Sequence, residues 1–330
     1  MKRVVVFAAL WAALGAACDT APPAGEHPGS AAGAGATVHL AGSGSAPGAG
    51  SAVAASSATP PAPAADRAPI ARPLLWAAEK AGQTTYFFGT MHVGIDAATQ
   101  LPPIVWGKLS DAPAFAMEAN LEDPHIAEMI KPTTSSLHAA LGDAYWHKLE
   151  AALGGTVAAA IDQMPPMIPA TLLAMKGLPP TPPMDKALQT RAAGEHKQIV
   201  FLEPAARQLE LLGKWMDVKA IRMILDELPD AEQRARTMLA AYAAGDERQI
   251  LATNDTDRVD ALQHGYTQAE YDREMTDLLY NRNASWIPEL EKLHAAGGGF
   301  VAVGALHLIG PRSVLDLLAH KGYKVTRLAP

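Results

Sequence analysis

The chain of 330 residues contains only one cysteine, Cys18. A single thiol cannot form a disulfide within the chain. Nor can it supply the several thiolates that zinc-finger and iron–sulfur sites use. Any metal that the folded part binds is therefore expected to have nitrogen and oxygen ligands.

The sequence also lacks an N-terminal apolar run long enough to span a membrane and a basic patch. The N-terminal apolar run, Val4 to Leu14, is shorter than the ~20 residues that a membrane-spanning helix needs. The formal net charge is −7, and there is no basic patch of the kind that holds phosphate backbones. We therefore expect neither a permanent transmembrane helix in this run nor a nucleic-acid partner.

The N-terminus has the order of an export signal. Lys2 and Arg3 precede the apolar run, and small residues separate that run from Cys18. The small residues and the cysteine resemble a bacterial lipobox, although Gly15 stands three positions before Cys18 and the expected leucine is one position earlier, at Leu14. This pattern predicts an exported protein of the bacterial cell envelope, anchored to the membrane by a lipid on Cys18. The alternative is a plain secretory signal with an incidental cysteine.

After the signal, residues 19–69 consist mainly of Ala, Gly, Ser and Pro with few charges. Such a composition cannot bury enough apolar surface to offset the entropy lost on ordering, so we expect a flexible tether. Residues 70–330, about 260 residues, suit one domain with a substantial core. The chain is thus divided into a signal of residues 1–18, a tether and one folded domain.

Six short runs in the folded part have the apolar or β-branched composition of strands. Most are continuously apolar rather than alternating, which is typical of strands covered on both faces. The segments between them have helical spacing, and most lie in one long insertion between Glu118 and Leu293. We therefore predict an α/β fold with a mixed central sheet flanked by helices. The expected strands are Pro73–Ala77, Thr85–Phe88, Ala114–Met117, Ile199–Leu202, Phe300–Val303 and Tyr323–Leu328.

Helices are expected where apolar residues recur at helical spacing near a start or stop signal. A stretch rich in Pro and Met, residues 163–184, is expected to be irregular or a broken helix that covers the site. The expected helices are Pro204–Trp215, Ala231–Ala244, Glu270–Tyr280 and Pro311–His320.

Two of the predicted strands lead into the same short motif, a glycine followed three residues later by a histidine. Gly89 precedes His92, and Gly304 precedes His307. Glycine after a buried strand lets the chain turn sharply or approach a ligand closely, and ligands bind at the carboxyl ends of strands in open α/β sheets. Because neutral imidazole is a common ligand of divalent metals, the two motifs together predict a metal site. The other histidines of the folded part are assigned to the surface or to structural roles: His125, His138, His147, His196, His264, His294 and His320.

Two carboxylates and an arginine belong to the same prediction. Glu118 and Glu203 each follow an apolar strand run. A carboxylate facing the core is costly, so we expect Glu118 to face the site as a metal ligand or general base. Glu203 is equally suited to capping the helix that follows it. Arg282 could hold a carboxylate or stabilise an oxyanion, although its spacing alone favours a surface salt bridge.

The segments that carry these residues resemble the TraB/GumN family, which includes the Tiki-type proteases. The resemblance runs from Leu74 to Leu328, through LLWAAEKAGQTTYFFGTMHVG, AMEAN, PMDKALQTRAAGEHKQIVFLEPAARQLELL, NRNASW and FVAVGALHLIGPRSVLDLLAHKGYKVTRL. It implies an α/β fold similar to those of erythromycin-esterase-like and haem-binding ChaN-like proteins. It also implies a site of His92, His307 and Glu118 and, as in the Tiki-type members, metal-dependent proteolysis with manganese or cobalt.

Together these observations predict an exported, lipid-anchored hydrolase that uses a divalent metal (manganese, cobalt or zinc). The expected substrate is a peptide or another small molecule. In this hypothesis His92, His307 and Glu118 form the metal site, and Glu203 and Arg282 support catalysis. The alternatives are a non-catalytic protein that holds a small ligand or haem on the same fold, an envelope interaction protein that keeps the motifs only as architecture, and a metal-free esterase with one histidine as base.

Overall fold

The computed structural model describes residues 69–120 and 122–329. The predicted export signal, the lipidation site Cys18 and nearly all of the predicted tether lie outside the described residues. In the described part of the chain, no helix is both long and apolar enough to span a membrane.

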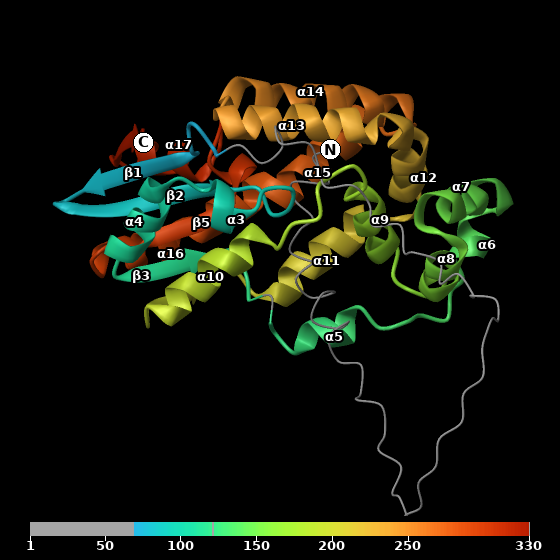
Figure 1. The fold of residues 1–330 in the computed structure, drawn as a ribbon, viewed down its shortest axis with the longest axis horizontal. Helices are drawn as coiled ribbons and strands as arrows, with labels where there is room; N and C mark the ends of the chain where they lie inside the picture. Colours follow the sequence, from blue (N-terminus) through green and yellow to red (C-terminus); the bar gives the residue numbers. More distant parts are fainter. Residues whose placement is uncertain (1–68, 121, 330) are drawn as a thin grey trace, which may run out of the picture.

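The centre of the fold is one six-stranded mixed sheet with the order β4-β3-β5-β2-β1-β6 (Figure 1). The four strands β4, β3, β5 and β2 are parallel to one another, and β1 pairs antiparallel with both β2 and β6. All six expected strands are present, which confirms the α/β prediction. Their bounds are β1 Leu75–Lys80, β2 Gln83–Thr90, β3 Ala114–Met117, β4 Gln198–Phe201, β5 Phe300–Gly304 and β6 Lys324–Arg327.

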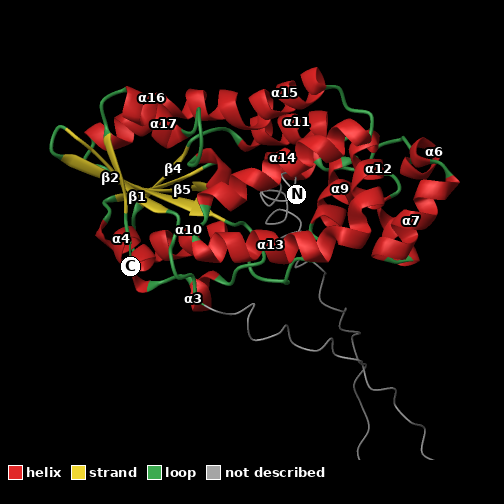
Figure 2. Ribbon diagram, turned by 90° about the horizontal axis from the view of Figure 1, so that it is seen from above, coloured by secondary structure: helices red, strands yellow, loops and turns green. Residues whose placement is uncertain are grey.

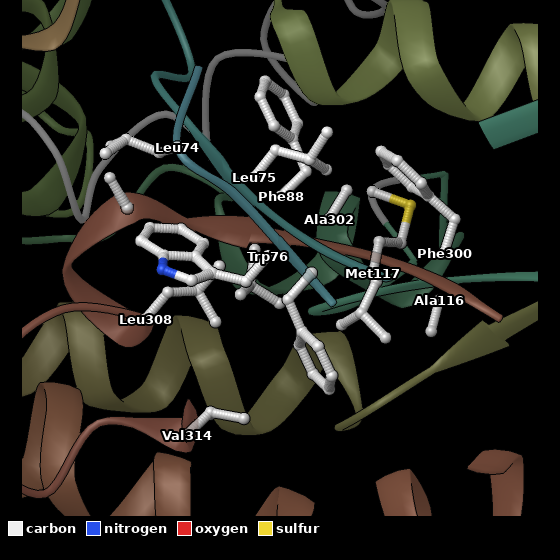
Figure 3. Close-up of a cluster of buried hydrophobic side chains, with 14 of the residues drawn as sticks. Leu74, Leu75, Trp76, Phe88, Ala116, Met117, Phe300, Ala302, Leu308 and Val314 are labelled. Atoms are coloured by element: carbon white, nitrogen blue, oxygen red, sulfur yellow. The ribbon is translucent and has the colours of Figure 1, made fainter. Parts of the chain in front are cut away.

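The continuous apolar runs of the sequence become the buried middle of this sheet. Every residue of β3 and β5 is buried. The Phe300 ring lies 6.1 Å from that of Phe88 and 6.3 Å from that of Phe115, so the aromatic side chains of three adjacent strands pack together. Figure 3 shows Phe88 and Phe300 among the buried apolar side chains of this core. Burial of such side chains stabilises the sheet by about 1.5–3 kcal/mol each.

Helices cover both faces of the sheet. Figure 2 shows α16 and α17 on one side of it and α4 and α10 on the other. The remaining helices form a helical lobe that extends from one end of the sheet (Figure 1). The helices near the sheet are α3 Ala97–Gln100, α4 Pro103–Asp111, α10 Met184–Gly194, α16 Asn281–Ala295 and α17 Val314–His320. The others are α5 His125–Met129, α6 Leu137–Leu141, α7 Asp143–Leu153, α8 Gly155–Ile161, α9 Met167–Ala174, α11 Ala205–Trp215, α12 Val218–Glu227, α13 Ala231–Ala244, α14 Glu247–Gln263 and α15 Gln268–Met275.

The helix predictions are confirmed with local differences. The helix expected at 270–280 begins at Gln268, because Thr267 and Glu270 form a capping box. Its last part is a π-helix, η3 (Thr276–Tyr280), which continues directly into α16. The helix expected from residue 311 begins at Val314, because the Ser313 side chain caps it. The stretch 163–184 is a broken helical segment with α9 in its middle, and β4 interrupts the long helical insertion.

Three separate groups of buried apolar residues hold these layers together. A sheet core includes Phe300, Val301 and the inner faces of α4, α10 and α16. A helical-lobe core is built from α5 to α9, α11 and α12. A third, smaller cluster joins α12, α14 and α15 and contains Met223. The three groups meet next to η3, close to the carboxyl ends of the parallel strands.

Candidate functional site

The four parallel strands deliver polar side chains to one edge of the sheet. His92 follows β2, His307 follows β5, Glu118 follows β3 and Glu203 follows β4. Because these strands are adjacent in the sheet and run in the same direction, their carboxyl ends lie side by side. All four side chains are at least nine-tenths buried. The sheet topology thus brings together residues from four separate parts of the chain.

Gly304, the last residue of β5, marks the point that these side chains share. A Cβ atom placed on Gly304 would lie 3.3 Å from His92 Nε2, 3.4 Å from Glu118 Oε1 and 3.5 Å from His307 Cδ2. The two imidazole rings and the carboxylate therefore face a common space, which the absent side chain of Gly304 leaves open. His307 Nε2 is also 3.7 Å from Glu118 Oε1.

His92 is fixed by a carboxylate from another element. Its Nδ1 lies 2.6 Å from Asp185 Oδ2, and the other oxygen of Asp185 accepts a hydrogen bond of 2.9 Å from the Thr90 hydroxyl. Burial disfavours the charged ring, but the attraction of Asp185 outweighs this and raises the pKa of His92 to about 9. With Nδ1 engaged, Nε2 is the nitrogen that faces the space beside Gly304. Metal-binding histidines commonly have this carboxylate partner.

Glu118 accepts hydrogen bonds at both oxygens. Oε1 accepts from the backbone N–H of Gly304 at 2.8 Å. Oε2 accepts from Gln208 Nε2 at 2.9 Å and from Arg282 Nη2 at 2.6 Å. Burial favours the neutral acid, but the positive charge of Arg282 and the remaining contacts outweigh it and hold the pKa of Glu118 well below its usual range. Glu118 is therefore an ionised carboxylate in the protein interior.

Arg282 connects the two carboxylates with one of the histidines. Its guanidinium donates from Nε and Nη2 to Glu203 Oε1, at 2.8 and 2.5 Å, and from Nη2 to Glu118 Oε2. Nη1 donates to the carbonyl of Leu278 at 3.1 Å and lies 3.2 Å from His307 Nε2. This guanidinium is the centre of the charged cluster.

The spacing-based expectation of a surface salt bridge at Arg282 is wrong, because only 1% of the residue is exposed. The expectation placed Arg282 after the end of a helix. Instead the π-helix η3 carries the chain without interruption into α16, and Arg282 lies in the first turn of α16, facing the sheet edge. The ring of Trp286, one turn further, lies 4.9 Å from the guanidinium carbon and adds a cation–π contact.

Glu203 pairs with Arg282 and does not cap the following helix. The N-cap of α11 is Pro204, and α11 has no side-chain cap hydrogen bond. Burial raises the pKa of Glu203, although the positive charge of Arg282 opposes this. The sequence left two roles open for Glu203, site residue and helix cap, and the structure excludes the cap.

His307 is held as a neutral ring. Its Nδ1 lies 2.6 Å from Asn283 Oδ1, and Asn283 in turn donates to the carbonyl of Arg312 at 2.9 Å. Burial lowers the pKa of His307 to about 3. A neutral ring that donates from Nδ1 to Asn283 presents the lone pair of Nε2 to Arg282.

Asp185 and Gln208 contact the site but were not predicted from the sequence. Asp185 lies in the first turn of α10. An acidic residue there is already explained by its favourable interaction with the helix dipole. Gln208 lies on the buried face of the amphipathic helix α11, and its polar character at a buried position was the available signal. Neither residue follows a strand, so the strand-end pattern that located His92, His307, Glu118 and Glu203 could not find them.

The comparisons with known proteins give one match. The model of the TraB/PrgY/gumN family matches residues 74–327. The chain belongs to this family. No curated protein and no solved structure matches the chain. The site residues of this TraB/PrgY/gumN member all lie inside the matched range.

The donor atoms of this TraB/PrgY/gumN site are of the kinds that divalent metals bind. Nε2 of His92 and Oε1 of Glu118 face the space at Gly304, and nitrogen and oxygen donors suit manganese, cobalt or zinc. Within residues 69–120 and 122–329, no three His, Cys, Asp or Glu side chains are arranged to hold a metal ion. The Nε2 lone pair of His307 faces Arg282.

Proposed function

We propose that this protein is a metal-dependent hydrolase of the bacterial cell envelope that cleaves a peptide or related amide bond. The observation that carries the proposal is the convergence of His92 Nε2, Glu118 Oε1 and His307 on one space beside Gly304. The envelope location rests on the N-terminal sequence alone. The expected metal is manganese, cobalt or zinc.

His92, Glu118 and His307 would hold the metal. When bound, it would supply a Lewis acid that polarises the substrate carbonyl. Asp185 keeps His92 oriented through Nδ1, and Asn283 keeps His307 in the tautomer whose Nε2 is free of a proton. Loss of the Nε2 proton of His92 and release of His307 Nε2 by Arg282 would then present two nitrogen lone pairs to the shared space.

Arg282 and Glu118 supply charge for the reaction. The guanidinium of Arg282 is held by Glu203 and can stabilise negative charge that develops on the substrate oxygen. Glu118, ionised in the free protein, has two possible roles: metal ligand, or base that accepts a proton from the attacking water. Burial favours the protonated, neutral form of Glu203. In that form Glu203 would hold the guanidinium of Arg282 less strongly.

The test uses full-length protein loaded with manganese and a peptide library. We expect hydrolysis by the wild-type protein and its loss in His92→Ala. The matched control is His125→Ala, which removes an imidazole that is 80% exposed and should leave turnover unchanged. Equal turnover in His92→Ala and wild type would refute the proposal. Absence of turnover together with a haem absorbance band would favour the ligand-binding alternative.

A further inference from the structure

A mainly apolar cavity of about 80 Å³ lies in the helical lobe, between α9, α12, α13, α14, α15 and η3. It lies where the sheet core, the helical-lobe core and the third apolar cluster adjoin one another. Leu173 in its wall belongs to the helical-lobe core, Leu306 to the sheet core and Met223 to the third cluster. The cavity is therefore a gap between well-packed units.

Two wall residues of the cavity are directly connected to the site. Leu306 lines the cavity and is the residue before His307. Leu278 also lines it, and the Leu278 carbonyl accepts the hydrogen bond from Arg282 Nη1. Leu278 lies in the π-helix η3, and π-helical turns frequently occur at functional sites. Leu278 and Leu306 thus connect the cavity wall with the proposed reaction centre.

The size of the cavity limits what it can accept. A water molecule needs about 10–15 Å³ of such volume, so 80 Å³ has room for roughly five to eight heavy atoms. This accommodates the four heavy atoms of a leucine or methionine side chain and the seven of a phenylalanine side chain, and it is far too small for a long fatty-acyl chain. The arginine of the wall, Arg234, is already paired with Asp260 at 2.6 Å and with Glu227 at 3.3 Å. It offers no unpaired guanidinium to an anionic ligand.

We infer that this cavity is a side-chain subsite of the proposed hydrolase and accepts one large, uncharged apolar side chain next to the bond that is cleaved. The inference rests on the proposed function, because it takes the neighbouring cluster as the reaction centre. It goes further by naming the class of substrate: peptides with leucine, methionine or phenylalanine at the position that enters the cavity.

The test measures binding as well as turnover. The probes are the N-acetyl amides of glycine, leucine and phenylalanine, with binding followed by NMR on the full chain. The leucine probe should bind at least about tenfold more tightly than the glycine probe, because an apolar pocket discriminates by this factor. The same preference is expected in His92→Ala, in which hydrolysis should be lost. Preference without hydrolysis in the wild type would refute the proposed function and leave the cavity as a binding site.

Two variants, one that fills the cavity and one that enlarges it, test whether the side chain of the probe binds there. Ala235→Leu adds a side chain at the cavity wall on α13 and should abolish the preference for leucine over glycine. Met223→Ala enlarges the cavity and should shift the preference from leucine towards phenylalanine. The matched control is Ala240→Leu, the same change at an exposed position of α13, which should behave as wild type.

The inference is overturned if the wild-type protein binds the three probes equally. It is also overturned if Ala235→Leu folds and keeps the preference seen in Ala240→Leu. If Ala235→Leu does not fold, Met223→Ala decides: an unchanged ratio of the affinities for the phenylalanine and leucine probes in that variant overturns the inference.

Discussion

Replacing Gly304 with alanine tests the convergence of the site groups without straining the backbone. Gly304 has φ −51° and ψ 138°, a conformation that any residue can adopt. The added methyl carbon would lie 3.3 Å from His92 Nε2, 3.4 Å from Glu118 Oε1 and 3.5 Å from His307 Cδ2. The closest of these contacts is slightly tight and requires a shift of a few tenths of an ångström. The fold should therefore tolerate the change.

The same methyl group fills the space that a bound ion or a substrate atom needs. Metal ligands lie about 2.0–2.2 Å from an ion, so a carbon atom within contact distance of both His92 and Glu118 leaves no room between them. We expect the affinity for manganese to fall by at least about 100-fold, because loss of an outer-sphere partner alone costs 10–100-fold. We expect the free energy of unfolding to change by no more than about 1 kcal/mol, since the gain from replacing glycine offsets the tight contact.

Calorimetric titration with manganese and urea unfolding measure the two quantities. Gly107→Ala is the matched control, because a Cβ on Gly107 would meet nothing within 4 Å and the residue lies inside α4. That variant should bind metal as the wild type does and be slightly more stable. Wild-type affinity in Gly304→Ala would refute the reasoning. So would a loss of more than about 2 kcal/mol of stability, which would mean that the space beside Gly304 is already filled.

Three further variants test the groups around this space. Asp185→Asn should reduce manganese affinity by about 10–100-fold in the same titration, because the carboxylate that orients His92 loses its charge; unchanged affinity would remove Asp185 from the account. Glu203→Ala should lower the free energy of unfolding by about 3–5 kcal/mol in urea, because it breaks a buried ion pair with Arg282. Glu128→Ala, at an exposed ion pair, should leave stability nearly unchanged, and equal losses in the two would contradict the buried role. Arg282→Lys should lose about 100-fold or more in peptide turnover, since one ammonium group cannot replace the fork of the guanidinium; retained turnover would exclude a role in charge stabilisation.

The sequence was most informative where residues follow strands. Apolar runs identified all six strands, and the carboxyl ends of parallel strands necessarily share an edge. His92, His307 and Glu118 could therefore be placed together from the sequence alone. The order of the strands could not be predicted, because it depends on long-range packing. The antiparallel strand β1 is an example: it is joined to β2 by the turn at Ala81 and Gly82 but also pairs with β6 from the other end of the domain.

The helical contributions to the site were harder to predict, for a physical reason. A helix presents a residue to the site only if the whole helix is rotated and shifted correctly, which tertiary packing decides. Arg282 was included in the site hypothesis although its spacing alone favoured the surface, and the sequence did not show the π-helical turn that carries the chain into α16. Asp185 was overlooked because its position at the start of α10 already had a local explanation. Site residues that lie on helices are therefore harder to predict from the sequence than site residues at the ends of strands.

The most direct test of the central claim is the metal content of natively purified full-length protein, compared with that of His92→Ala and His307→Ala. The two histidines are 215 positions apart in the sequence and face one space in the structure. We expect a fixed amount of manganese, cobalt or zinc in the wild-type protein and its loss in each single variant. Metal retained in either variant, or no metal in the wild type after supplementation with all three ions, would contradict the account.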